Sequence, residues 1–282
     1  MIRIGTRGSA LAQAQARWVA KQIADEATLV TITTAGDRGA DLADKSQWVS
    51  ELEHALLEGR IDVAVHSAKD VPAELADGLE LVALPARADP RDAICGVRSL
   101  AELPVGGRVG TSSLRRTAQI RAARDDLEVT SVRGNVDTRL RKLADGGYDA
   151  LVLAAAGLWR LGHQPDGILA ELVPAAGQGA LALEARASDD RVRTCTGNLR
   201  DEQTTACVLA ERELTRRLGA SCNSAVGANA RPCGDGRIEL RAWVGRSDGS
   251  AWISDRLQGS PPGLGSAVAE RLLAVGAEEM LE

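Results

Sequence analysis

The segment LGASCNSAVG, residues 218–227, places one thiol, Cys222, among the smallest side chains that a loop can carry. A charged segment that favours helix comes directly before it. A cysteine in such a loop is either an inert, buried thiol or a reactive group, since thiol chemistry depends on exposure and on the surrounding charges. The residue types alone leave both interpretations open.

The segment VAVHSAKDVP holds a second set of reactive side chains. Lys69 and Asp70 directly follow an apolar strand pattern at residues 61–68. Because ligands of α/β sheets bind at the carboxyl ends of strands, Asp70 is well placed to act as a carboxylate acid or base. The alternative is that Asp70 caps a turn before Pro72, which is a common use of aspartate.

The segment RVGTSSLRRTAQ combines hydroxyl groups, a helix start and a pair of cations. A strand pattern ends at Gly110, and Thr111 and Ser113 then precede a helix whose first turn carries Arg115 and Arg116. Cations in a first turn oppose the helix dipole, whereas an anion bound there is stabilised by it. The pattern therefore favours an anion site, and two ordinary surface arginines are the alternative.

The same arrangement recurs at two other strand ends. Arg133 ends a strand pattern, Gly134 permits close backbone approach, and Arg139 lies on the following predicted helix. Arg7 follows the first strand pattern, with Ser9 at the N-cap of the next helix. Arginine binds carboxylates through two parallel hydrogen bonds, so these turns together predict a cleft for a ligand with several carboxylates. A phosphate ligand is less favoured, because no phosphate-binding glycine motif occurs.

Alternating strands and helices are predicted to position these side chains. In the first predicted helix, Leu11, Trp18, Val19 and Ile23 share one face. The predicted strands are 1–6, 29–34, 61–68, 79–85, 108–111, 127–133 and 149–157, and the predicted helices are 10–26, 48–59, 113–124 and 135–147.

Two breaks in this alternation indicate how the chain divides into domains. Residues 85–93 contain two prolines and several charges and are predicted to form a hinge, and residues 173–186 are predicted to form a second linker. From about Asp201 the pattern changes to a long helix, a hairpin over 237–259 and a last helix near Gly265. We therefore predict an α/β fold: two α/β domains joined by a hinge, similar to periplasmic binding proteins, and a small α+β C-terminal domain. The predicted domains are 1–86 with 180–197, 91–174, and 200–282.

Composition excludes several classes of protein. The 282 residues carry a net charge of −5, which argues against a general nucleic-acid coat, although only four of the 34 basic residues are lysines. No apolar run approaches the ~20 residues of a membrane span, and the N-terminus lacks a secretory h-region, so we expect a cytoplasmic protein without a membrane partner. The five cysteines and three histidines match no metal spacing, so no metal site is expected.

Taken together, the motifs resemble those of a known family. Eight segments occur in the order found in the porphobilinogen deaminase, or hydroxymethylbilane synthase, family. They are TRGSALA, VAVHSAKDVP, DPRDA, VGTSSLRR, VRGNVDTRL, GLWRLG, PAAGQGALALEAR and CNSAVG. The resemblance spans about the whole chain. It implies an enzyme of heme biosynthesis that condenses four porphobilinogen molecules head to tail, each losing ammonia to give an electrophilic azafulvene, and releases linear hydroxymethylbilane.

The resemblance also implies a role for each candidate residue. Cys222 would hold a covalent dipyrromethane cofactor through a thioether bond, and Asp70 would be the catalytic carboxylate. Lys45 and Trp48 would belong to a lid, which is several residues shorter here than is usual in the family. The carboxylates of the growing chain would be bound by Arg7, Arg115, Arg116, Arg133, Arg139 and Arg160, with lesser contacts from Ser9, Lys69, Thr111, Ser113 and Gln178.

Two other functions are weighed against this one. A non-catalytic two-domain clamp for an anionic small molecule would explain the arginines but not the third domain with Cys222. A hydrolase with a cysteine nucleophile would require a histidine near the thiol. A monomer is expected in each case.

Overall fold

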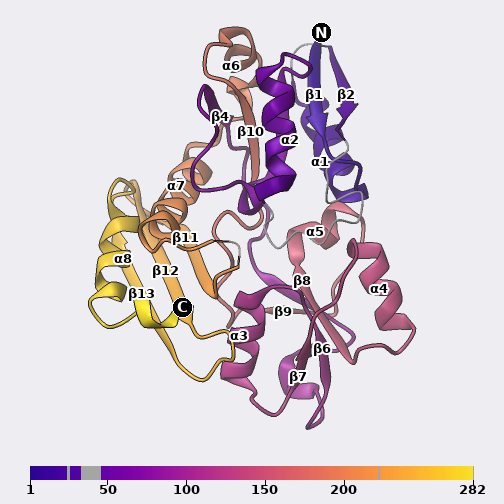
Figure 1. The fold of residues 1–282 in the computed structure, drawn as a ribbon, viewed down its shortest axis with the longest axis vertical. Coiled ribbons are helices and arrows are strands. Elements are labelled where there is room, and N and C mark those ends of the chain that lie inside the picture. The colour runs from indigo at the N-terminus through magenta and orange to yellow at the C-terminus, as the bar shows by residue number, and fades with distance from the viewer. Residues whose placement is uncertain (24–25, 33–45, 222, 282) are drawn as a thin grey trace.

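The computed structural model describes residues 1–23, 26–32, 46–221 and 223–281, apart from the side chains of residues 46–48. Its strands form three sheets of five, five and three strands. In Figure 1 the first sheet lies at the top, the second at the lower right and the third at the left. The mixed α/β class and the smaller C-terminal sheet are as predicted. Within the described residues, no helix is both long and apolar enough to cross a membrane.

The first sheet contains strands from two separate parts of the chain. Its order is β2 (Ala27–Thr31), β1 (Ile2–Thr6), β3 (Val63–Ser67), β10 (Leu181–Arg186) and β4 (Leu79–Ala83). β1 pairs in parallel with β2 and β3, whereas β10 runs antiparallel between β3 and β4. The helices of this region are α1 (Ala10–Ala20), α2 (Ser46–Leu57) and α6 (Asp190–Thr196).

The second sheet repeats this topology. Its order is β7 (Glu128–Thr130), β6 (Arg108–Gly110), β8 (Ala150–Ala154), β5 (Asp92–Cys95) and β9 (Gly167–Leu169). β6 pairs in parallel with β7 and β8, and β5 is antiparallel to its neighbours. The region also contains α3 (Leu114–Ala123), α4 (Val136–Ala144) and α5 (Ala155–Arg160).

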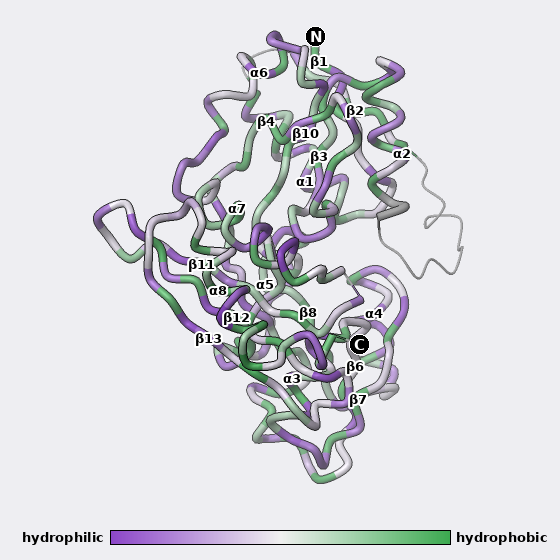
Figure 2. Tube along the Cα trace, turned by 60° about the vertical axis from the view of Figure 1, so that its left-hand side comes forward, coloured by the Kyte–Doolittle hydropathy of each residue, from purple (hydrophilic) through white to green (hydrophobic). Residues whose placement is uncertain are grey.

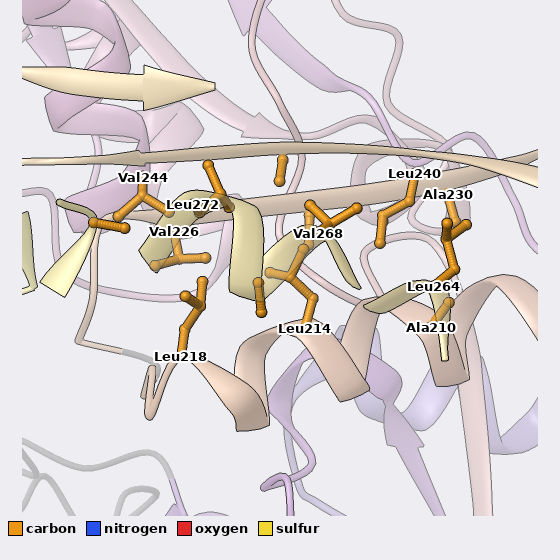
Figure 3. Packing of buried hydrophobic residues seen from close by; sticks show 14 of the residues in the cluster. Ala210, Leu214, Leu218, Val226, Ala230, Leu240, Val244, Leu264, Val268 and Leu272 are labelled. Atoms are coloured by element: carbon orange, nitrogen blue, oxygen red, sulfur yellow. The ribbon is translucent and has the colours of Figure 1, made fainter. Parts of the chain in front are cut away.

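The third sheet is a meander covered by two helices. β11 (Val226–Gly234), β12 (Arg237–Gly245) and β13 (Trp252–Gly259) are antiparallel, which confirms the predicted hairpin. α7 (Glu202–Arg217) and α8 (Leu264–Leu273) pack on one face. Figure 3 shows Leu214 of α7 and Val268 of α8 pointing toward one another under Leu240 of β12, all three fully buried. This cluster is the core of the C-terminal region.

The central strands of the first two sheets, β3 and β8, are mostly apolar, apart from His66 and Ser67 at the end of β3. The first four residues of β3 and of β8 are buried, as expected for strands that are covered on both faces. In Figure 2, which is coloured by hydropathy, β3 lies in the upper part of the molecule and β8 below it. β3 ends at Ser67 and leads into the turn that holds Lys69 and Asp70, whereas β8 ends at Ala154 and leads into α5.

The chain passes between the first two sheets twice, through residues 84–91 and 170–180. Both connections are fastened to α7 by Glu211, whose side chain is fully buried. Its Oε1 accepts hydrogen bonds from Arg87 Nη1 and from the Ala230 amide, both at 2.6 Å. Its Oε2 accepts one from the Gly177 amide at 2.7 Å. A single carboxylate thus joins the three regions.

Three predictions of local structure are wrong. Helix α1 ends at Ala20 rather than at residue 26, and Trp18 is 43% exposed while Val19 is buried. The predicted linker 173–186 contains β10, because its apolar half completes the first sheet. The predicted strand 149–157 ends at Ala154, where the chain turns into α5.

Candidate active site

Asp70 lies at the end of β3, in a single turn of 3₁₀ helix, η2 (Ala68–Asp70). It is partly exposed and lines a cavity of about 340 Å³. The same cavity is lined by Lys69 of the same turn and by candidates from two other places in the chain, namely Ser113, Arg115 and Arg116, and Gln178. Two of the four strand-end positions that the sequence indicated, those after β3 and after β6, therefore meet around one space.

The pair Arg115 and Arg116 is buried, so the alternative of two surface arginines is wrong. Ser113 caps α3 by accepting a hydrogen bond from the Arg116 amide at 3.4 Å. Both guanidinium groups turn inward onto Asp92 of β5. Arg115 Nη1 donates to Asp92 Oδ2 at 2.7 Å, and Arg116 Nε donates to Oδ1 at 2.8 Å.

The charge balance of this cluster favours a further anion. Burial alone would raise the pKa of Asp92, but Arg115 and Arg116 outweigh it and hold that pKa well below its ordinary value. Asp92 is therefore ionised, and one carboxylate faces two guanidinium groups. The Nε atom of Arg115 is also buried and has no hydrogen-bond partner among the described residues. Unpaired buried charge is costly, so the surplus cation favours an anionic ligand.

Gln178 connects the Asp70 turn to this cluster. Its Oε1 accepts hydrogen bonds from Lys69 Nζ at 3.3 Å and from Arg116 Nη2 at 3.2 Å. Its Nε2 donates to Asp92 Oδ1 at 2.8 Å. The preceding Gly177 has a φ of +71°, and a Cβ atom there would lie 2.9 Å from the Ala68 carbonyl carbon. The GQG segment can approach the Asp70 turn this closely because Gly177 has no side chain.

Arg139 and Arg160 are cations whose hydrogen bonds, among the described residues, go to backbone carbonyls. Arg139 Nε donates to the Gly134 carbonyl, and Arg160 Nη2 to the Gly179 carbonyl, both at 2.7 Å. Burial lowers the pKa of Arg160 to about 10. Burial, followed by the nearby Arg116, also lowers the pKa of Arg139. Neither has a carboxylate within 4 Å among the described residues, as expected for cations that bind an acidic ligand.

The remaining candidates with described side chains do not line the 340 Å³ cavity. Arg7 follows β1, and the Oγ of Ser9 caps α1 by accepting from the Ala12 amide. Thr111 is buried beside Ser113, whose amide donates to its Oγ1 at 3.3 Å. Arg133 is exposed just before α4.

The side chains of three predicted site residues are not described by the structure. Cys222 and Lys45 lie outside the described residues, and Trp48 lies in α2 with a side chain that is not described. The neighbours of Cys222 are described, and Ala220, Ser221 and Ser224 all line the cavity. The chain on both sides of the thiol position therefore borders the space next to Asp70.

The sequence did not single out Asp92 or Arg212 as site residues. Arg212 of α7 lines the cavity and donates to the carbonyls of Val71, Pro72 and Ala73 at 3.0, 2.6 and 3.1 Å. It therefore holds the segment that directly follows Asp70. The position of Arg212 in a long amphipathic helix gives no sign of this contact. Asp92 does leave a signal in the sequence, because an acidic residue within an apolar strand usually needs a charged partner.

Family comparison covers nearly the whole chain. Residues 2–194 match the family described as porphobilinogen deaminase, dipyromethane cofactor binding domain, and residues 205–274 match porphobilinogen deaminase, C-terminal domain. Curated relatives named porphobilinogen deaminase include that of Deinococcus radiodurans, 45% identical over 100% of this chain and 98% of the relative. That of Sorangium cellulosum is 48% identical over 98% and 97%.

Solved structures give weaker matches. A periplasmic substrate-binding protein of an ABC transporter from Coxiella burnetii matches with 15% identity and a TM-score of 0.44, over 73% of this chain and 94% of that one. A putative methionine-binding lipoprotein from Bacillus subtilis gives 11% and 0.43, over 72% and 91%.

Proposed function

The chain belongs to the porphobilinogen deaminase family and has its hydroxymethylbilane synthase activity, and we propose that the cavity beside Asp70 is the catalytic centre. The enzyme is a transferase of tetrapyrrole biosynthesis: it joins four porphobilinogen molecules into linear hydroxymethylbilane and releases ammonia. The non-catalytic clamp is not favoured, because relatives at 43–48% identity over the full length carry the enzyme's name.

The chain carries the family's dipyrromethane cofactor-binding domain, and the residues around the cavity suit such a group. A dipyrromethane is a pair of linked pyrroles with acidic substituents, so it requires several cations and an apolar wall. The surplus positive charge of the Arg115–Arg116–Asp92 cluster and the buried Nε of Arg115 meet the first requirement. Ala175, Ala176 and Val226 supply apolar lining. When bound, the cofactor supplies the carbon to which the first substrate unit is joined.

The attachment point of the cofactor is Cys222 in this proposal. Ala220 and Ser221 precede the thiol and Ser224 follows it, and these small residues border the cavity. Small neighbours allow the sulfur to approach a bulky pyrrole carbon. Of the other cysteines, Cys95, Cys195 and Cys207 are buried and Cys233 is exposed at the far end of β11. Burial raises the pKa of Cys95 and of Cys207 to about 11, which makes both poor nucleophiles.

Asp70 is the acid–base group in this proposal. Its carboxylate faces the cavity from the rigid end of β3, where it can stabilise the ammonium group of porphobilinogen as that group leaves. The same carboxylate can then accept a hydrogen bond from the pyrrole N–H and so stabilise positive charge on the ring. Lys69 is held by Gln178 at 3.3 Å beside it.

The arginines bind and orient carboxylates. Four of these arginines are buried or partly buried: Arg115, Arg116, Arg139 and Arg160. The same role is assigned to Arg7 and Arg133 at their strand ends. Ser9, Thr111 and Ser113 are assigned lesser contacts. Lys45 and Trp48 are assigned to a lid, and this remains a proposal from the resemblance alone.

The domain division is also a proposal: 1–86 with 180–197, 91–174, and 200–282. The membership of the three sheets supports it, since β10 belongs to the first sheet and β11–β13 form the third. We further propose a cytoplasmic monomer. Four free thiols among the described residues are typical of a reducing compartment. Light scattering during gel filtration tests this oligomeric state, and the molar mass of one chain is expected.

The observation that carries the proposal is that Asp70, the buried arginine pair and both sides of the Cys222 loop border one cavity. Its test is the denatured mass of the purified enzyme. Wild type is expected to exceed the polypeptide mass by two linked pyrrole units, and so is the matched control Cys233→Ser. Cys222→Ser is expected to show the bare mass. A pyrrole adduct that persists in Cys222→Ser would refute the attachment point.

A further inference from the structure

A second and larger cavity, of about 730 Å³, lies away from Asp70, and no residue of the catalytic cavity lines it. Both connections between the first two sheets contribute to it, through residues 86–91 and residues 170, 172 and 174. α7 and the third sheet form the other walls. Its volume is within the range of about 300–1,000 Å³ that is usual for small-molecule sites.

The charged residues of this cavity are unequally paired. Near the connections, Arg87 is paired with the buried Glu211, and Arg91 with Asp89, while Asp201 caps α7. On the third sheet, Arg231, Arg241 and Arg256 all lie near a single buried acid, Glu239. Arg231 binds Glu239 at 2.9 Å, and Arg256 is 3.9 Å from it. The third-sheet wall therefore has more cations than acids, although the whole chain has a net charge of −5.

Arg241 and Arg256 form the centre of this excess. They are directly opposite each other on β12 and β13, an arrangement that is unfavourable for like charges. The guanidinium of Arg241 donates to the Glu171 carbonyl at 3.0 Å and has no carboxylate within 4 Å among the described residues. Burial, and then Arg256, lowers the pKa of Arg241. Both arginines line the cavity, so an anion in it would relieve their repulsion.

We propose that this second cavity is a binding site for a small organic di- or tricarboxylate, held mainly by Arg241 and Arg256. Two adjacent guanidinium groups match two carboxylates, and the connections add apolar lining beside their charged residues, from Ala86, Ala88, Pro90, Ala170, Leu172 and Pro174. A ligand with acidic groups on an apolar body therefore fits better than a bare inorganic ion. Because both connections line the cavity, the ligand would contact them and the third sheet together. The proposal does not depend on the roles of Cys222 and Asp70.

The test uses benzene-1,3,5-tricarboxylate as the probe and isothermal titration calorimetry of the holoenzyme. Arg241→Gln/Arg256→Gln is expected to weaken the probe's affinity by about tenfold or more, as expected for lost charge-assisted hydrogen bonds. The matched control is Arg246→Gln, which removes an exposed arginine in the turn between β12 and β13, outside the cavity, and should bind like wild type. Pyrophosphate is expected to bind more weakly than the probe.

Three results would overturn the proposal. These are equal affinity of the double variant and Arg246→Gln, complete displacement of the probe by saturating porphobilinogen, and tighter binding of pyrophosphate. The variants should fold, because both removed charges repel each other. Arg256→Gln alone, at a side chain that is 59% exposed, gives a second variant that should show a smaller loss of affinity.

Discussion

Asp92 and Arg115 form an ion pair in which Asp92 Oδ2 lies 2.7 Å from Arg115 Nη1. The pair is buried, because neither side chain is more than 4% exposed. Replacing Asp92 with asparagine would leave two buried guanidinium groups without a counter-charge. We expect Asp92→Asn to lower the free energy of unfolding by about 3–5 kcal/mol, measured by urea denaturation. Asp89→Asn removes an acid from the more exposed pair with Arg91 and should cost about 1 kcal/mol or less. Equal losses in the two variants would contradict the buried-pair argument.

Asp70→Asn keeps the shape of the side chain but removes its charge. If the carboxylate assists the departure of ammonia, kcat should fall by about 10²–10⁴-fold while the melting temperature stays near that of wild type. Asp77→Asn, at an exposed position beyond the same turn, is the matched control and should keep full activity. Normal turnover in Asp70→Asn would remove Asp70 from the mechanism.

Arg212→Gln tests a positioning residue. Its guanidinium holds three carbonyls of residues 71–73, so its loss should free the segment behind Asp70. We expect kcat to fall by about tenfold or more with a smaller change in KM, since small misplacement of a catalytic group is costly. Arg216→Gln, one turn further along α7 and exposed, should have little effect. A loss of stability with unchanged kcat would indicate a purely structural role.

Arg139→Gln tests whether the arginines that lack carboxylate partners bind the growing product. Chain elongation is expected to stall, so that mass spectrometry detects oligomers shorter than four units and turnover falls by about tenfold or more. Arg141→Gln changes the same charge on the exposed side of α4 and serves as the control. Wild-type turnover in Arg139→Gln would disprove this assignment.

Glu53 gives the protein a predictable pH dependence. Burial raises the pKa of Glu53; the Ala76 amide opposes this rise, and Glu184 adds to it. The folded protein therefore binds a proton at Glu53 more tightly than the unfolded chain does. Its contribution to stability is lost as the pH rises from about 4.3, the ordinary glutamate pKa, through the raised value.

Glu53→Gln cannot ionise, so it should melt at a higher temperature than wild type at pH 7. The difference should shrink as the pH falls toward 4. Glu58→Gln, at an exposed position in the turn directly after the same helix, should show no such trend. Melting curves across this pH range would contradict the argument if the two variants behaved alike.

The sequence predicted the strand-end turns well and their partners poorly. A local pattern indicates Asp70 and Arg115, since each lies in the turn or helix that follows an apolar strand. The pairing of Arg115 with Asp92 depends on how β5 lies beside β8, which no local pattern records. The glycines at 177 and 179, just before β10, are typical of a loop, so the sequence predicts a linker there instead of a strand. Arg212 was missed because its acceptors are backbone carbonyls about 140 residues away in the sequence.

The position of β10 between β3 and β4 has a consequence for synthesis of the protein. On the ribosome, the first sheet has a vacant place between two of its strands until residues 181–186 emerge. By then the whole second sheet has been made and can already have folded. The nascent N-terminal region therefore exposes unpaired strand edges for most of translation, which makes this interval the one in which a chaperone would protect the chain from aggregation.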